Sequence, residues 1–327
     1  MAAPRTLLLV DANHLLHRVM RQPATVELKF AGTFGFLRCL RNAMERYPYR
    51  QCIACWDGGL SARRLQLLPT YKHRTDRGDE AEAEEYRARF KLNRAYLHRL
   101  LPLLGVVDLK LAGREADDIV FQARLAAQRL ADAAALPVGA VVISEDRDFL
   151  QMVNDDTDIY QPRHDRYVTT SSFVPIVKLP PERFLLFKSV LGDAGDNVPG
   201  IKSVGEVTAF QIASEGPIAP EREPGPPQWD DVPAWCAAHE NRRVRAVAPA
   251  WDTVLLNYEL VAFAREAFER EELDRIRAAI ESPPPVNQDG AYELMDALQF
   301  ASLLHGFANW IVPFRRLDSG PCFRRLP

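Results

Sequence analysis

The stretch LLLVD at residues 7–11 is a short run of apolar, β-favouring residues that ends at an aspartate. The same arrangement recurs at CIACWD (52–57) and VVISED (141–146), and GVVDLKL (105–111) is a further strand-like run. Segments with helical periodicity separate these runs, at about residues 33–47, 90–104 and 115–134. Because strands alternate with helices, the sequence predicts an α/β fold with a mostly parallel central sheet flanked by helices.

Acidic side chains gather where the predicted strands end and where helices begin. Ligand crevices in such sheets form beyond the carboxyl ends of the strands, and Asp11, Asp57 and Asp146 each occupy that position. Carboxylates raise each other's pKa and oppose folding when they crowd together, so this pattern indicates a divalent cation, Mg²⁺ or Mn²⁺. The candidate metal ligands are Asp11, Asp57, Glu115, Asp117, Asp118, Asp146, Asp148, Asp193 and Asp196.

Two divalent ions can activate a water and stabilise the leaving oxygen of a phosphodiester displacement without any nucleophilic side chain. The sequence contains no nucleophile elbow, Walker A loop, HExxH motif or Cys/His pair at metal spacing. A single cluster such as GREADD (113–118) is also typical of an ordinary acidic helix N-terminus. Five clusters, three of which follow strands, favour the metal centre over that alternative.

The overall charge and the cysteines exclude few functions. The formal net charge of −3 includes the nine carboxylates, and the rest of the chain is net positive, so a polyanionic ligand is not excluded. Five cysteines form no paired framework, and Cys52 and Cys55 lie in a strand-like run, which favours core packing over zinc or redox chemistry. No apolar run suits a signal peptide or a membrane span. We therefore expect a cytoplasmic protein with no membrane partner.

The pattern becomes helical beyond Pro180. Helices are predicted at 181–191 and 203–214, and the segment GDAGDNVPGIKSVG (192–205) joins them. Its glycines allow backbone amides to approach a phosphate closely, with Lys202 beside them. Such an element binds the nucleic-acid backbone without reading bases, whereas a plain helix connection would not need so many glycines.

Several motifs, taken together, resemble those of the 5′ nuclease family. That family includes the 5′–3′ exonuclease domain of bacterial DNA polymerase I, flap endonucleases, and bacteriophage 5′ exonucleases of the ribonuclease H type. The resemblance covers about residues 5–215, and the motifs occur in the family's order. The motifs are LLLVDANHLLHR (7–18), CIACWDGG (52–59), TYKHR (70–74), GREADDIV (113–120), ISEDRDFLQMV (143–153) and LGDAGDNVPGIKSVGEVTA (191–209).

The resemblance implies a PIN-like (resolvase-like) nuclease domain over residues 1–180, with a helical arch at about 69–95. It also implies a helical region over 181–327 that includes a helix–three-turn–helix element at about 183–214. The nine carboxylates would bind two Mg²⁺ ions, for which Mn²⁺ can substitute, and the helix–three-turn–helix loop would bind K⁺. The candidate catalytic residues are Lys72, near the scissile phosphate, and Arg74. The candidate DNA-binding residues are Tyr71, Arg77, Gly200, Lys202 and Gly205.

These features predict a divalent-metal-dependent 5′–3′ exonuclease and structure-specific flap endonuclease with roles in DNA replication and repair. Its expected substrates are DNA with 5′ single-stranded ends, flaps or nicks, and RNA–DNA hybrids are a second candidate. The resemblance also agrees with a location in the cytoplasm, which is that of the bacterial host if the enzyme is phage-encoded. Replication proteins are candidate partners. Two alternatives stay open: a PIN-type ribonuclease, and a catalytically weak branched-DNA-binding module of the same fold.

Overall fold

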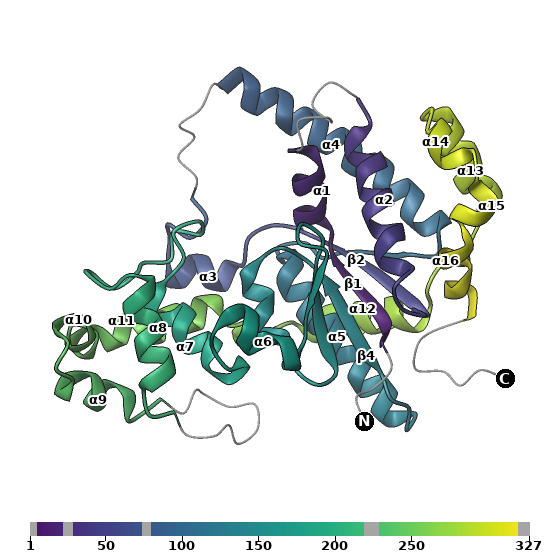
Figure 1. The fold of residues 1–327 in the computed structure, drawn as a ribbon. Helices are drawn as coiled ribbons and strands as arrows, with labels where there is room; N and C mark the ends of the chain where they lie inside the picture. Colours follow the sequence, from purple (N-terminus) through teal and green to yellow (C-terminus); the bar gives the residue numbers. More distant parts are fainter. Residues whose placement is uncertain (1–4, 22–28, 74–79, 219–228, 320–327) are drawn as a thin grey trace. The chain divides into compact units, whose positions relative to one another are not determined.

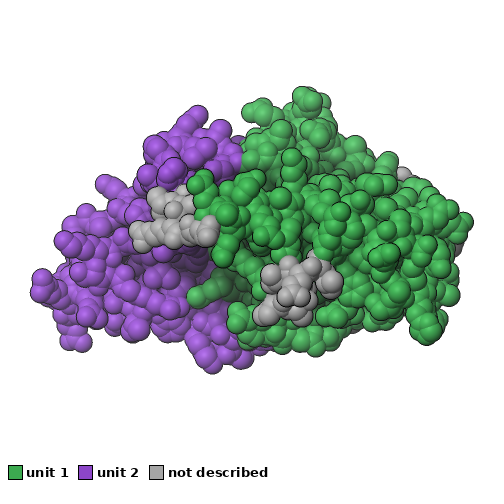
Figure 2. Space-filling view, turned by 90° about the horizontal axis from the view of Figure 1, so that it is seen from above, with its two compact units in different colours: residues 1–59, 76–167, 268–327 green, residues 60–75, 168–267 purple. Residues whose placement is uncertain are grey.

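The computed structural model describes residues 5–21, 29–73, 80–218 and 229–319 (Figure 1). The chain forms two compact units (Figure 2). Unit 1 comprises residues 1–59, 76–167 and 268–327, and unit 2 comprises residues 60–75 and 168–267. The sequence predicts a single boundary near residue 180, whereas both compact units are discontinuous. The difference arises because α12 (Arg270–Glu281) and the helices after it pack against helices of unit 1.

The sheet has six strands in the order β3-β2-β1-β4-β5-β6. The strands are β1 Arg5–Asp11, β2 Gln51–Trp56, β3 Val107–Lys110, β4 Gly139–Ile143, β5 Thr157–Gln161 and β6 Arg166–Val168. Parallel pairing joins β1 to β2 and β4, β2 to β3, and β4 to β5, which confirms the predicted mostly parallel sheet. The sequence prediction missed β5 because TDIYQ is short and largely polar, and it is buried through its pairing with β4.

The central strands are buried over most of their described length. Residues 7–10 of β1 and 52–56 of β2 have no exposed surface, as expected for a parallel sheet that is covered on both faces. Cys52 and Cys55 belong to this core, and burial raises the pKa of both thiols. The interpretation of these cysteines as packing residues is thereby confirmed.

Helices cover both faces of the sheet in unit 1 (Figure 1). On one side lie α1 Ala12–Met20, α2 Ala31–Met44 and α4 Glu80–Leu103, and on the other lie α5 Ala116–Ala133 and α12 Arg270–Glu281. The short helices α13 Gln288–Ala297, α14 Ala301–Leu304, α15 Phe307–Trp310 and α16 Val312–Arg315 follow. The acidic stretch that begins at Glu80 is helical and lies within the segment for which the resemblance implies a helical arch. Alanine and glutamate favour helix, and Glu80 and Glu82 complement the positive end of the helix dipole.

Unit 2 is helical in its described residues. Its helices are α3 Ala62–Leu67, α6 Thr170–Val177, α7 Phe184–Leu191, α8 Glu206–Glu215, α9 Val232–Ala238, α10 Arg242–Arg245 and α11 Trp251–Val261. Helices α7 and α8, joined by residues 192–205, form the predicted helix–loop–helix element, and α7 also packs along α11. Within the described parts of both units, no helix is long and apolar enough to cross a membrane.

Candidate metal centre

Asp11 lies at the carboxyl end of β1 and connects that strand to the end of β4. Its Oδ1 accepts a hydrogen bond from the backbone N–H of His14 at 3.1 Å, which caps α1. Its Oδ2 accepts a hydrogen bond from Ser144 Oγ at 3.0 Å, and Ser144 directly follows β4. Because β1 and β4 are parallel neighbours, their ends meet at one edge of the sheet, as the sequence predicts.

Asp57 follows β2 and holds two other elements at the same edge. Its Oδ2 accepts a hydrogen bond from Asn13 Nδ2 at 2.5 Å, and its Oδ1 accepts one from the backbone N–H of Ala116 at 2.8 Å. Asp57 therefore joins the start of α1 to the start of α5. The sequence prediction missed Asn13, since only the fold brings it to a carboxylate 44 residues away. Its one visible signal is an amide two residues after Asp11.

The GREADD segment places its acids at the N-terminus of α5. Glu115 is the N-cap residue and is buried, Asp118 is fully buried, and Asp117 Oδ1 accepts a hydrogen bond from the Asp118 N–H at 2.7 Å. The loop before α5 is fixed to the loop after β2, because Gly58 N–H donates to Arg114 O at 2.8 Å. These carboxylates and Asp57 are thus set by one pair of interlocked loops.

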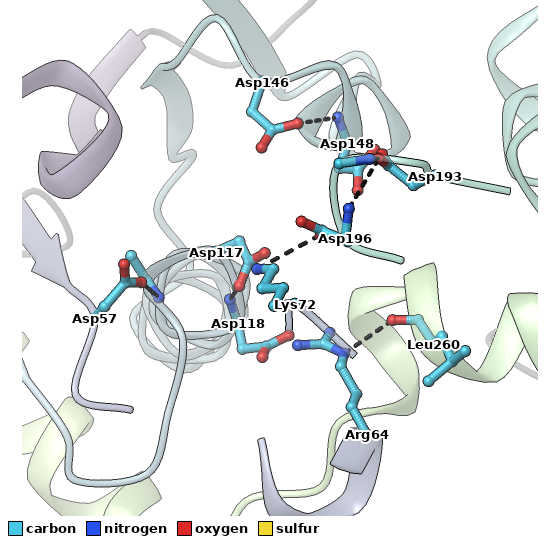
Figure 3. Close-up of polar contacts among 12 residues, drawn as sticks. Asp57, Arg64, Lys72, Asp117, Asp118, Asp146, Asp148, Asp193, Asp196 and Leu260 are labelled. Carbon is cyan, nitrogen blue, oxygen red and sulfur yellow. Dashed lines mark hydrogen bonds and ion pairs between the residues drawn. The ribbon is translucent and has the colours of Figure 1, made fainter. Parts of the chain in front are cut away.

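Asp146 and Asp148 lie just beyond β4. The backbone N–H of Asp148 donates to Asp146 Oδ1 at 2.9 Å, so Asp146 caps the 3₁₀ turn Arg147–Met152 (Figure 3). The N–H of Asp146 in turn donates to Ser144 Oγ at 3.1 Å. Ser144 therefore links the Asp146 turn to the Asp11 carboxylate.

Electrostatics single out Asp11. Burial raises the pKa of Asp11 to about 6, the His14 charge and amide lower it, and the nearby Asp57 and Asp146 raise it further. The charged form of Asp11 is therefore disfavoured, and a bound cation would reverse this. The negative charges of Asp57 and Asp146, at the ends of β2 and β4, thus act on the buried Asp11 carboxylate at the end of β1.

The donor set fits a divalent cation that prefers oxygen ligands. Beside the carboxylates, the buried Asn13 Oδ1 has no hydrogen-bond partner among the described residues, so an oxygen is available in a buried polar setting. No three His, Cys, Asp or Glu side chains of the described chain converge closely enough to form a metal-binding group. The chemistry of the site therefore supports the cation, while the complete ligand set stays a prediction.

The other two predicted ligands belong to unit 2, and their partners lie in the same unit. Asp193 Oδ2 binds Lys188 Nζ at 2.8 Å, and its Oδ1 accepts from the Gly195 N–H at 2.8 Å. Burial opposes ionisation, but Lys188 and the loop amides prevail and lower the pKa of Asp193. Asp196 Oδ2 lies 3.6 Å from Lys72 Nζ (Figure 3). The Asp193 side chain organises the loop, Asp196 pairs with Lys72, and the role of both as metal ligands stays a prediction.

The remaining predicted residues differ in their surroundings. Tyr71 is only 4% exposed and packs with Val198, so its ring is a core residue, and its candidate role in DNA binding stays a prediction. Lys202 is exposed, and Gly205 is the N-cap of α8 with open space around it. A side chain at Gly200 would clash, because its Cβ would lie 2.6 Å from the Leu191 carbonyl oxygen. Arg74 and Arg77 lie outside the described residues.

Comparison with known proteins decides the family. Residues 6–175 match the model of the 5′–3′ exonuclease, N-terminal resolvase-like domain. The chain belongs to the 5′–3′ exonuclease family. The predicted family and the predicted class, a nuclease acting on DNA, are thereby confirmed. The 5′–3′ exonuclease of Bacillus subtilis is 30% identical over 222 residues, which cover 64% of this chain and 70% of that protein.

Other relatives are longer proteins or solved structures. DNA polymerase I of Thermus filiformis is 27% identical over 215 residues, which cover 65% of this chain but only 24% of that polymerase. The T5 D15 protein co-crystallised with metal ions has a TM-score of 0.64 at 19% identity and covers 90% of this chain and 99% of its own. The catalytic core of Rad2 in complex with DNA substrate has a TM-score of 0.56 at 16% identity, and the match covers 96% of this chain and 93% of the Rad2 chain. These likenesses confirm the resolvase-like fold.

Proposed function

We propose that this protein is a divalent-metal-dependent 5′–3′ exonuclease and flap endonuclease that hydrolyses phosphodiester bonds in DNA. One observation carries the proposal: the buried Asp11 carboxylate is linked through Ser144 to the end of β4 and lies in the field of Asp57 and Asp146. A cation is the simplest means to stabilise that charge. The 5′–3′ exonuclease of Bacillus subtilis and the metal-bound T5 D15 protein support it as relatives.

The cofactor in this proposal is a pair of Mg²⁺ ions, with Mn²⁺ as a substitute. Bound ions supply an activated water and a stabilised leaving oxygen, which is the usual chemistry of two-metal hydrolysis. Asp11 is largely ionised above its pKa of about 6, while Ser144 and the His14 amide fix its two oxygens. Asn13 and the Ala116 N–H hold Asp57 in the same way. The proposed ligands are the nine carboxylates named above.

Substrate placement in this proposal falls to unit 2. Lys72 Nζ lies 5.3 Å from the Tyr71 ring centroid and 3.6 Å from Asp196, and its charge would stabilise the scissile phosphate. Arg74 and Arg77 are further candidates. The exposed Lys202, the loop amides and the start of α8 would bind duplex phosphates, with K⁺ at the loop. The proposed substrates are 5′ single-stranded ends, flaps, nicks and RNA–DNA hybrids, acted on in the cytoplasm.

A cleavage assay tests the proposal directly. The protein is incubated with 5′-labelled flap, nicked and single-stranded DNA, and with single-stranded RNA, in Mg²⁺ or in EDTA, beside the Asp146→Asn variant. We expect metal-dependent release of 5′ products by the wild type and none by the variant. Undiminished cleavage in EDTA, or by Asp146→Asn, would refute the metal centre. Binding of flap DNA without cleavage would favour the binding-module alternative, and cleavage of RNA alone would favour the PIN-type ribonuclease.

A further inference from the structure

One side chain of the Gly-rich loop fastens that loop to the turn that carries Lys72. Asn197 Nδ2 donates hydrogen bonds to the carbonyl oxygens of Thr70 at 2.9 Å and His73 at 2.6 Å. These carbonyls lie on either side of Tyr71 and Lys72, so a single amide closes the turn from both ends. All of these residues belong to unit 2.

The backbone makes the same connection. The Lys72 N–H donates to the Asp196 carbonyl oxygen at 2.9 Å, beside the ion pair between their side chains. Lys72 and Asn197 both have left-handed backbones, with φ of 51° and 58°. Side-chain-bearing residues adopt that conformation only where their surroundings impose it, although asparagine tolerates it better than most. The direction of the Lys72 side chain therefore depends on the loop.

A shared core lies beneath the turn and the loop. Tyr71 from the turn and Val198 from the loop are buried together against Leu260 and Val261 of α11. Arg64 donates to the Leu260 carbonyl at 2.8 Å, and its guanidinium lies 5.8 Å from the Tyr71 ring centroid. The turn and the loop thus share one hydrophobic core, and the exposed Asn197 side chain joins them outside that core.

We propose that Asn197 is a positioning residue that couples the duplex-binding loop to Lys72. Binding of duplex to the loop then fixes the turn that presents the lysine to the scissile phosphate. This inference rests on the proposed nuclease function. Asn197 is itself exposed, so its amide fills no core and can be replaced without leaving a cavity.

Two substitutions at Asn197 distinguish the effect of its side-chain hydrogen bonds from the effect of its left-handed backbone conformation. Asn197→Gly keeps the left-handed conformation and removes both hydrogen bonds, whereas Asn197→Asp keeps the shape but turns an acceptor toward two carbonyls. For Asn197→Gly we expect kcat on flap DNA to fall by about 10-fold, with KM changed by less than about 2-fold. For Asn197→Asp we expect a larger fall in kcat. An unchanged kcat in both variants would overturn the proposal.

A double-mutant comparison shows whether Asn197 acts through Lys72. In a Lys72→Ala background, Asn197→Gly should cause no further loss of kcat, because the group that it positions is already absent. A loss that persists in that background, or one confined to KM, would mean that Asn197 contacts DNA itself, and the inference would be wrong.

Hydrogen exchange of backbone amides tests the coupling without requiring catalytic activity. The amide of Lys72 should exchange faster in DNA-free Asn197→Gly than in wild type, while amides of the central strand β1 keep their rates. Equal exchange at Lys72 would contradict the coupling even if the variants cleave slowly. If the wild type cleaves none of the substrates, the proposed function fails, while the exchange result still decides whether Asn197 holds the turn.

Discussion

Asp11→Asn should stabilise the metal-free protein while it abolishes activity. Asp11 is 6% exposed, and its pKa of about 6 stands above the ordinary value of 3.8. Because the folded pKa is raised, the folded state binds the Asp11 proton more tightly than the unfolded state does. The stability contributed by this proton is complete below pH 3.8 and is lost as the pH rises through about 6.

The shift gives the size of the effect. A pKa raised from 3.8 to about 6 corresponds to about 3 kcal/mol of destabilisation near pH 8, at about 1.4 kcal/mol per pKa unit. The same difference in pKa destabilises the protein by only about 1 kcal/mol near pH 4.5, because Asp11 is largely protonated in the folded state at that pH. Asparagine keeps an acceptor for the His14 N–H and a polar partner for Ser144, so little of this gain is offset.

Urea unfolding in EDTA measures the prediction, with wild type and Asp11→Asn compared near pH 8 and near pH 4.5. The exposed Asp296 on α13 provides the matched control, because Asp296→Asn removes the same charge without changing a buried group. We expect Asp11→Asn to gain stability that grows with pH, and Asp296→Asn to change little at either pH. A variant that is less stable than wild type near pH 8, or a gain independent of pH, would refute the reasoning.

Three further predictions test the supports of the site. Gly58→Ala should lower the free energy of unfolding by about 1–3 kcal/mol in chemical denaturation, since the added Cβ would lie 1.7 Å from the Leu111 carbonyl oxygen. Lys202→Glu should weaken duplex binding equally for unrelated sequences and flatten its salt dependence in filter-binding titrations; a sequence-selective loss would contradict backbone binding. Arg114→Lys should lose the bidentate pairing with Glu272 and weaken Mn²⁺ binding followed by paramagnetic resonance, whereas unchanged affinity would exclude a positioning role.

The sequence predicts the strand-end acids well because their placement follows from topology alone. Parallel neighbours end at the same edge, so Asp11, Asp57 and Asp146 could be placed together from the apolar runs that precede them. The sequence could not show that Asn13 holds Asp57, since this contact depends on how α1 leaves β1. The burial of Tyr71 was equally hidden, because its packing partner Val198 lies far along the chain.

The chain beyond the matched residues 6–175 supports the segments that carry candidate site residues in both units, and this support could not be foreseen from the sequence. In unit 2, Asn257 of α11 is fully buried, and its Nδ2 donates to the carbonyls of Ser189 at 2.9 Å and Pro199 at 2.7 Å. It thereby holds α7 and the Gly-rich loop together.

In unit 1, α12 has the corresponding role for the segment that carries Glu115. Glu272 binds the Arg114 guanidinium with both carboxylate oxygens, at 2.7 and 2.6 Å, and that guanidinium also lies 4.5 Å from the Phe268 ring centroid. Charged, bidentate pairs of this kind fix direction as well as distance. Because Arg114 is the residue before Glu115, its fixed orientation limits how far the N-cap of α5 can move. Helix α12 therefore supports the segment that carries Glu115, although no acid of the predicted metal centre lies in that helix.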